Sequence, residues 1–353
     1  MDRTYAGSYG RLKVLRLEFL NQDFMKSLID KTPEEILQAL STTSYREDLD
    51  ALSAFSSGTR LLEMAINRHL IKKNRQAMQA PPPAARKFLE SYFSKWDIEN
   101  VKTILSSKFI GYDLKETEEF IMSFRDVPSG LFGGRMKREE FRSLMNLSSI
   151  ESVIESISRL PFGLRAMQAL DQYRKTNDVS FIFSTMDNFY LEDVMSSLKY
   201  FNGDEGSVRR YFKEQIDLKN ATLLLKSIEL HVDHDLIRTH LINGGSVKPE
   251  NIEEILHQEN MESSLKKASE LVIQQGNAYP ATIVDFELQA KKAIYGRSID
   301  AISYSALSLT SIFAFILMSE MEREVMRAIV LGKALKLPRE RILSIAGIEM
   351  RGG

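Results

Sequence analysis

The sequence predicts an all-α fold built from three related helical lobes, and two observations carry this prediction. Leu, Glu, Lys, Arg, Met and Ala dominate the chain, while the alternation of β-branched residues that is typical of strands is nearly absent. One helical stretch also recurs three times along the 353 residues. Repetition of a helix within one chain indicates a repeated architecture before it indicates any chemistry.

The recurring stretch is clearest in residues 211–225, which read YFKEQIDLKNATLLL. Residues 92–105 read YFSKWDIENVKTIL, and residues 317–330 form a fainter third copy. An acid occupies one shared position, and the first two copies carry an amide three residues later, where it shares a helix face with the acid. In chain order these pairs are Asp97 with Asn100, Asp217 with Asn220, and Glu322 with Val325.

A second phrase with the features of a helix start also recurs. Residues 32–39 (TPEEILQA), 137–144 (KREEFRSL) and 248–255 (KPENIEEI) superpose on one another, and a glycine pair precedes the last two. Glycine permits a positive φ where one helix stops and the chain turns toward the next. The predicted structural turns are therefore at Gly133, Gly134, Gly244 and Gly245.

The repeat is circularly shifted, because the chain begins with the end of one unit and finishes with the start of another. We therefore expect the N-terminal and C-terminal helices to complete one lobe together. The breaks fall at three consecutive prolines, which a helix interior does not tolerate, and at the glycine-containing residues 202–206. The predicted division is residues 1–80 plus 299–353 for the first lobe, 81–87 for a Pro-rich linker, 88–200 for the second lobe and 207–298 for the third.

Composition narrows the classes of function. The net charge of −1 provides no general attraction for nucleic acid or for an anionic membrane. The absence of cysteine removes disulfides, thiolate metal sites and cysteine nucleophiles, and residues 1–5 lack the apolar core of a signal peptide. Residues 301–319 carry no formal charge but contain six Ser and Thr residues. We expect this stretch to form a helix buried inside the protein rather than one inserted in a membrane.

The residues give little support for catalysis. The sequence contains no phosphate loop, dinucleotide fingerprint, serine elbow or zincin motif, so no cofactor and no small-molecule substrate are expected. No histidine is tied by spacing to the recurring acids, which favours a structural role as helix caps or as polar contacts between helices. If one helix carried both His231 and His234, the pair could bind a metal, but a solvated helix edge is the preferred interpretation.

Several stretches together resemble a known family. They are residues 40–45 (LSTTSY), 96–102 (WDIENVK), 216–220 (IDLKN) and 322–333 (EREVMRAIVLGK). In combination they are similar to the central-stalk C subunit of archaeal A-type rotary ATPases, the counterpart of the d subunit in the vacuolar ATPase. The resemblance covers nearly the whole chain. It implies a funnel-shaped helical protein whose three lobes are arranged with pseudo-threefold symmetry.

The resemblance also implies a function without catalysis. A protein of this family would sit on the cytoplasmic end of the membrane proteolipid ring, as a peripheral subunit, and receive the foot of the shaft made by subunits D and F. It would pass torque between shaft and ring during ion-coupled ATP synthesis or hydrolysis. Two alternatives stay open from the residues alone: a cytoplasmic helical-repeat scaffold that binds other proteins, and a metal-dependent hydrolase built on His231 and His234.

The same reasoning gives an expected site. The interface of a torque coupling should be largely polar, because an exposed apolar socket would aggregate before assembly. We therefore expect the recurring polar residues to line or brace the cavity that receives the shaft. These residues are Asp97, Asn100, Asp217, Asn220, Glu322 and Arg327.

Overall fold

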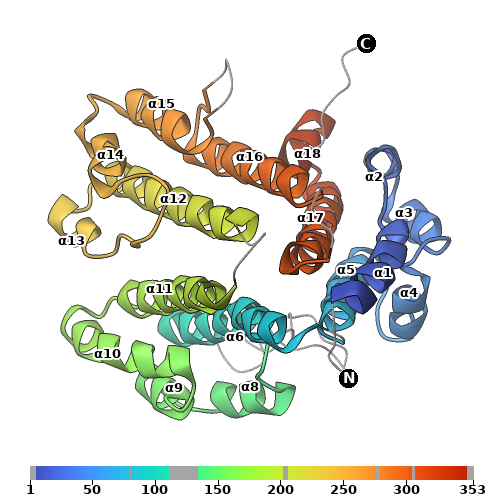
Figure 1. Ribbon diagram of the computed structural model, residues 1–353, viewed down its shortest axis with the longest axis horizontal. Helices are drawn as coiled ribbons and strands as arrows, with labels where there is room; N and C mark the ends of the chain where they lie inside the picture. The colour runs from blue at the N-terminus through green and yellow to red at the C-terminus, as the bar shows by residue number, and fades with distance from the viewer. Residues whose placement is uncertain are drawn as a thin grey trace. The chain divides into compact units, whose positions relative to one another are not determined.

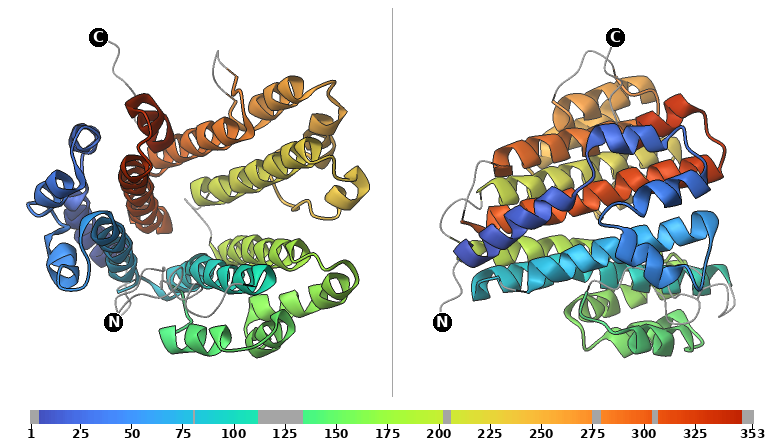
Figure 2. Two further views of the ribbon diagram at one scale, coloured as in Figure 1. Left: turned by 180° about the vertical axis from the view of Figure 1, so that it is seen from behind. Right: turned by 90° about the vertical axis from the view of Figure 1, so that its right-hand side faces the viewer.

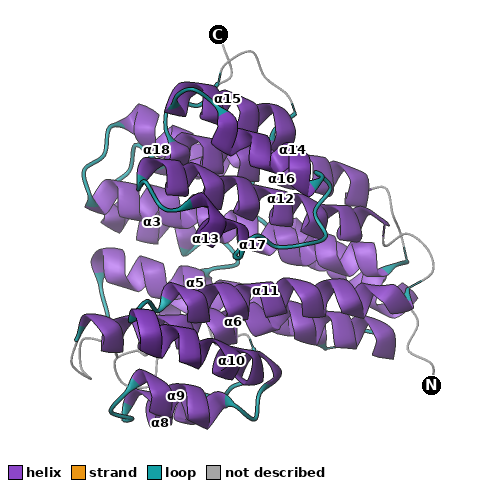
Figure 3. Cartoon of the chain, turned by 90° about the vertical axis from the view of Figure 1, so that its left-hand side faces the viewer, coloured by secondary structure: helices purple, strands orange, loops and turns teal. Residues whose placement is uncertain are grey.

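The computed structural model describes residues 5–79, 81–111, 134–201, 206–274, 279–303 and 307–347. Over these ranges the regular structure is entirely helical and contains no strand (Figure 3). This confirms the all-α prediction. None of the helices in these ranges combines the length and the apolar character needed to cross a membrane.

The chain divides into two compact units. Unit 1 comprises Met1–Ser197 and Phe315–Gly353, and unit 2 comprises Leu198–Ala314. Unit 1 contains two separate large hydrophobic cores, described next. The lobe boundaries given above stay a prediction.

The first core of unit 1 joins the two ends of the chain. Its apolar cluster includes Met25, Leu28 and Leu62 from the N-terminal part together with Ile329 and Ile342 from the C-terminal part. Figure 1 shows the blue N-terminal helices beside the red C-terminal ones, and a second view agrees (Figure 2). The helices are α1 (Tyr5–Leu15), η1 (Arg16–Glu18), α2 (Gln22–Leu28), α3 (Pro33–Leu40), α4 (Arg46–Leu52), α5 (Gly58–Met78), α17 (Leu309–Ala334, in unit 1 from Phe315 on) and α18 (Arg339–Ala346).

The second core of unit 1 is formed around α6. Its helices are α6 (Pro83–Ile110), α8 (Arg138–Met145), α9 (Ile150–Ile157), α10 (Pro161–Thr176) and α11 (Ser180–Ser197). Pro83 begins α6, where the missing N–H costs nothing because the first helical amides have no intrahelical partner. Gly111 ends the helix at a φ of 85°. Buried Ile98, Val101 and Ile104 form the stripe of α6 that faces this core.

Unit 2 is organised around α12. Its helices are η3 (Leu198–Tyr200), α12 (Gly206–Glu229), α13 (His234–Arg238), α14 (Pro249–Glu253), η4 (Glu254–His257), α15 (Met261–Val272) and α16 (Ile283–Ser303). α12 packs against both α15 and α16. It buries Phe212, Leu224 and Leu225.

The expectation of one helix over residues 301–319 was wrong. α16 ends at Ser303 and α17 begins at Leu309. Leu307 has a φ of 58°, a left-handed conformation that a helix interior does not accommodate. Burial was predicted correctly for the part within α17, because Ile312–Leu317 are all at most 1% exposed.

Candidate functional site

The three recurring acids lie in the interiors of the long helices α6, α12 and α17, which excludes an N-cap role for Asp97. Each acid is at most 4% exposed and accepts backbone N–H groups from a segment that returns to its helix. Asp97 Oδ2 accepts the N–H groups of Arg135 at 2.7 Å and Met136 at 3.2 Å. Each acid therefore fixes a connecting segment.

The other two acids make equivalent bonds. Asp217 Oδ2 accepts the N–H of Ser246 at 2.9 Å, and its Oδ1 accepts that of Val247 at 3.2 Å. Glu322 Oε2 accepts the N–H of Leu20 at 2.6 Å. Together the three contacts define a common register for the repeats.

This register corrects one alignment made from sequence. The amides that the acids bind, those of Met136, Val247 and Leu20, immediately precede the N-caps of α8, α14 and α2. Each copy then buries three apolar residues at the same spacing, within α8, within α14 and the following η4, and within α2 and its C-cap. These sets are Phe141, Leu144 and Met145; Ile252, Ile255 and Leu256; and Met25, Leu28 and Ile29. The N-terminal counterpart of residues 137–144 and 248–255 therefore begins at Asn21, the cap of α2, and not at Thr32.

The second glycine of each pair is required by the neighbouring carboxylate. A Cβ on Gly134 would lie 2.1 Å from Asp97 Oδ1, and one on Gly245 would lie 2.0 Å from Asp217 Oδ1. Gly244 has the predicted positive φ, at 98°. Gly133 lies outside the described residues.

The first core of unit 1 has no glycine at the corresponding place. Two residues before Leu20 the chain carries Glu18, and the acid in this copy is the longer Glu322. The extra methylene lets the carboxylate of Glu322 bond to the N–H of Leu20 although residue 18 has a full side chain. Two copies thus combine Asp with a glycine, and the third combines the longer Glu with a residue that has a side chain, and in each the carboxylate reaches a backbone N–H.

The recurring amide also acts on a returning segment. Asn220 Nδ2 donates to the carbonyl oxygen of Ile242 at 2.8 Å, and its Oδ1 accepts the N–H of Ile242 at 2.9 Å. Asn220 also lines a small cleft of ≈ 220 Å³ together with the loop before α14. Asn100 is buried at the equivalent position. Val325 replaces the amide in the third copy and packs against the first core.

Arg327 lies apart from these contacts. Its Nη2 is 3.4 Å from Oε1 of Glu63 on α5, and the pair is partly exposed. Each acid, and Asn220, thus bonds to a separate connecting segment. The contacts within either unit do not bring the predicted site residues together in one site. Their assignment to a shaft-binding cavity stays a prediction.

Burial changes the acidity of these carboxyl groups. Removal from water raises the pKa of Asp97 to about 6 and that of Asp217 to about 6, and in both cases it outweighs the opposing effect of the backbone N–H donors. Burial likewise raises the pKa of Glu322, against the N–H of Leu20 and the nearby His69. These groups therefore hold protons more strongly than exposed carboxylates do.

The surroundings of Glu322 contain residues that the sequence analysis missed. The hydroxyl of Tyr45 donates to Glu322 Oε1 at 2.9 Å. His69 stacks on Tyr45 with ring centroids 4.0 Å apart. Its Nδ1 lies 2.8 Å from Asp48 Oδ2, and its Nε2 lies 3.9 Å from Glu322 Oε1. Burial, followed by the charge of Glu322, raises the pKa of Tyr45 well above its usual value. The acid clamp of the first core is thus part of a buried polar network.

A second missed cluster joins α6 to α17 within unit 1. Glu320 accepts from the hydroxyl of Tyr92 at 2.8 Å and from Lys95 Nζ at 2.7 Å. The Lys95 ammonium lies 3.9 Å from the ring centroid of Tyr92 and 4.6 Å from that of Trp96. Arg323 of α17 lies over the same indole at 5.8 Å. Cation–π contacts and a buried ion pair therefore fix the crossing of these two helices.

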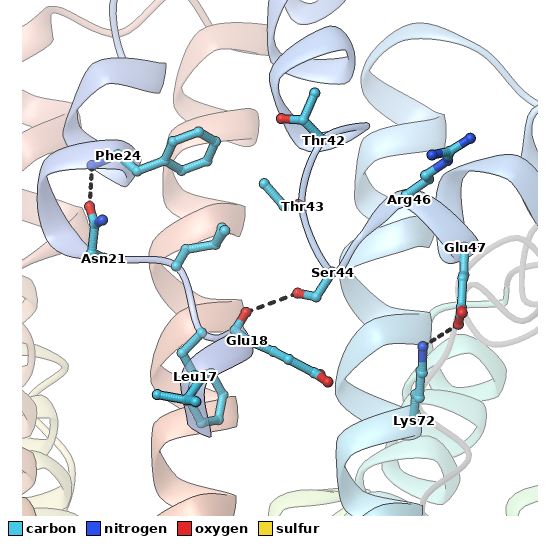
Figure 4. Close-up of a pocket in the computed structure, with 12 residues that line it drawn as sticks. Leu17, Glu18, Asn21, Phe24, Thr42, Thr43, Ser44, Arg46, Glu47 and Lys72 are labelled. Carbon is cyan, nitrogen blue, oxygen red and sulfur yellow. Dashed lines mark hydrogen bonds and ion pairs between the residues drawn. The ribbon is translucent and has the colours of Figure 1, made fainter. Parts of the chain in front are cut away.

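An open cleft of ≈ 570 Å³ lies beside the clamped N-terminal segment (Figure 4). In the close-up, Ser44 donates to the carbonyl oxygen of Glu18, and Lys72 pairs with Glu47. The exposed side chain of Leu17 lies at its edge. No nucleophile paired with a base is found among the residues that line it.

The histidine pair does not form the helical face that a metal would need. His231 follows α12 with a φ of 52°, and His234 begins α13. Both side chains are exposed. In the parts of the chain that the structure describes, no three His, Asp or Glu side chains are grouped to hold a metal.

These observations describe a helical-repeat protein whose recurring polar residues hold its own connecting segments. The family model described as ATP synthase (C/AC39) subunit matches residues 8–345, and the chain belongs to this family. It is 39% identical to the C subunit of the A-type ATP synthase of Thermoplasma volcanium, over 98% of this chain and 98% of that protein. It is 37% identical to the C subunit of the A-type ATP synthase of Thermoplasma acidophilum, over 99% of this chain and 100% of that protein. It is 24% identical to the C subunit of Methanococcoides burtonii, over 96% of this chain and 92% of that protein.

The clamp contacts give a first prediction. Replacing Asp217 and Asn220 together by alanine should destabilise unit 2, because the amides of Ser246 and Val247 and both backbone groups of Ile242 lose their partners. We expect a loss of about 2–5 kcal/mol, which is below the sum for four fully buried groups at about 1–3 kcal/mol each, because this segment is partly exposed and water can replace some of the lost bonds. If these residues also brace a shaft-binding surface, affinity for the shaft falls with stability. Calorimetry and binding measurements on the same variant check this, and a wild-type melting temperature with wild-type affinity would refute it.

Proposed function

We propose that this chain is a non-catalytic subunit of an A-type rotary ATP synthase that connects the central shaft to the proteolipid ring in the membrane. The observation that carries the proposal is the end-to-end match to proteins named as the C subunit of A-type ATP synthases, at 37–39% identity. Its partners would be the shaft subunits D and F on one side and the ring on the other. It would lie peripherally, on the cytoplasmic face of the membrane.

The internal contacts suit a part that transmits torque. Such a part must resist shear, and close packing of helices provides that resistance. Each of the three acids ties a connecting segment to a long helix at a buried position. The Glu320, Lys95 and Trp96 cluster adds a further link between α6 and α17. Torque can pass through such a body without any bond being made or broken.

Assembly from purified parts tests the proposal. The wild-type chain should bind the D–F shaft and the detergent-purified ring separately, and should bridge them when all three are mixed, as seen by sedimentation. The purified chain alone should not hydrolyse ATP. Recovery of soluble client proteins in place of shaft and ring, in a pull-down from membranes, would favour the scaffold alternative. Turnover of a substrate by the chain alone would end the non-catalytic assignment.

A further inference from the structure

The common register extends to the ends of the three long helices. Thirteen residues after each acid the chain has a branched aliphatic residue, and this residue is strongly exposed in every copy. These residues are Ile110, Leu230 and Leu335, with exposed fractions of 63%, 69% and 71%. We call them the helix-end residues.

The backbone after the helix-end residues also shares one feature. The next residue is left-handed in each copy, with φ of 85° at Gly111, 52° at His231 and 54° at Lys336. After α12 the N–H of Val232 bonds to the carbonyl oxygen of Ser227 at 2.9 Å. After α17 the N–H of Leu337 bonds to that of Gly332, also at 2.9 Å. A left-handed residue therefore follows the aliphatic side chain in all three copies, and after α12 and α17 the hydrogen bonding is the same as well.

Two of the three left-handed residues are not glycine. His231 and Lys336 adopt a conformation that L-residues with a side chain seldom take, so the helix ends at this place even without a glycine. Strained backbone of this kind is concentrated at functional positions. The position of the helix end is therefore retained at a cost.

The chemistry of the neighbours is not retained. The preceding residues are Phe109, Glu229 and Ala334, and the following ones are Gly111, His231 and Lys336. A single exposed aliphatic residue needs no explanation. Three at one structural position are different, because side chains exposed by 63–71% gain little from packing within the protein. Folding alone therefore does not account for their repetition.

We propose that Ile110, Leu230 and Leu335 are equivalent contact points for a partner that presents one apolar surface several times, namely a ring of identical subunits. Branched aliphatic side chains at one repeated position match a partner whose own surface repeats. A partner without internal repetition would present a different surface to each helix-end residue, and three different surfaces would not favour the same class of side chain. This inference rests on the proposed function, in which the proteolipid ring is such a partner.

Serine substitutions test the contact points directly. The variants are Ile110→Ser, Leu230→Ser, Leu335→Ser and the triple combination. A matched control replaces Val14, Leu164 and Val284 by serine, residues that are 64%, 60% and 55% exposed but lie outside the repeated position. Binding is measured to the detergent-purified ring and, separately, to the D–F shaft.

We expect each single variant to weaken ring binding about fivefold and the triple variant about a hundredfold, from the apolar area that each side chain would bury. Shaft binding and melting temperature should stay at wild-type values, because the side chains are exposed. The control should bind the ring normally.

Each other outcome overturns the inference in a distinguishable way. If the triple variant binds the ring as well as wild type does, or if the control loses as much, the helix-end residues are not the contact points and the proposed function stands. If only self-association is lost, the occupant is a second copy of this chain. If only binding to lipid vesicles of the source membrane is lost, the helix-end residues contact the bilayer. If the wild-type chain binds neither ring nor shaft, the proposed function fails together with the inference.

Discussion

Replacing Gly245 by alanine is expected to destabilise unit 2 by about 1–4 kcal/mol, since an amide without its partner costs about 1–3 kcal/mol when buried and less when partly exposed, as the amides of Ser246 and Val247 are. The new Cβ would lie 2.0 Å from Asp217 Oδ1, so the carboxylate must move away from the N–H groups of Ser246 and Val247. Amide exchange is the most direct measurement, because the protection of these two amides should fall before that of the α12 core.

Gly296 provides the matched control. It lies in α16 of the same unit, and a Cβ there would meet nothing within 4 Å. Gly296→Ala should be neutral or stabilising by up to about 1 kcal/mol, from the higher helix propensity of alanine. In a double-mutant cycle, Gly245→Ala and Asp217→Ala should add less than their separate effects, because both remove the same contacts. Independent, additive losses would show that the glycine is needed for another reason.

A second large effect is expected from pH: the free energy of unfolding should fall as pH rises from about 4 to about 7. The folded-state pKa of Asp97 and of Asp217 is about 6, above the ordinary value of 3.8. Between these values the folded protein holds a proton that the unfolded chain releases. The resulting stabilisation is complete below pH 3.8 and is lost as pH rises through about 6. We expect about 1–3 kcal/mol from each carboxyl group.

Asp97→Asn and Asp217→Asn isolate this contribution from that of other titrating groups. Urea unfolding is followed from pH 4 to pH 7.5. The fluorescence of Trp96, the one tryptophan of the chain, reports on unit 1, and amide exchange reports on unit 2. The difference in stability between wild type and each variant should change across this range. A difference that stays constant with pH would show that the buried carboxyl groups titrate as ordinary ones do.

The sequence predicted the helices and the acid register because both are periodic signals within one segment. Asp97 and Asp217 stand at the same place in nearly the same stripe of apolar residues, so their equivalence could be read directly. Thr32 was misaligned for a physical reason. Thr32 forms a capping box with Glu35, and the Glu140 carboxylate likewise accepts the backbone N–H of Lys137. This local signal marks any helix start without saying which helix begins there.

The rest of the candidate site depends on contacts between distant segments. Tyr45 meets Glu322 across 277 positions of the chain, and Tyr92 meets Glu320 across 228. No spacing rule connects residues so far apart. The role of Gly245 was likewise only half predicted: a turn explains Gly244, whereas the approach of the Asp217 carboxylate becomes visible only with coordinates.

The core shared by Met25, Leu28, Ile329 and Ile342 has a consequence for how the protein is made. During translation, α2 to α5, which end at Met78, leave the ribosome well before α17, which begins at Leu309, and α18 supply their part of this core. The helices between them can fold in the meantime, since domains generally fold as units during synthesis. The first part of the chain to be made is therefore the last to be finished, and until then its unpaired face is open to chaperones.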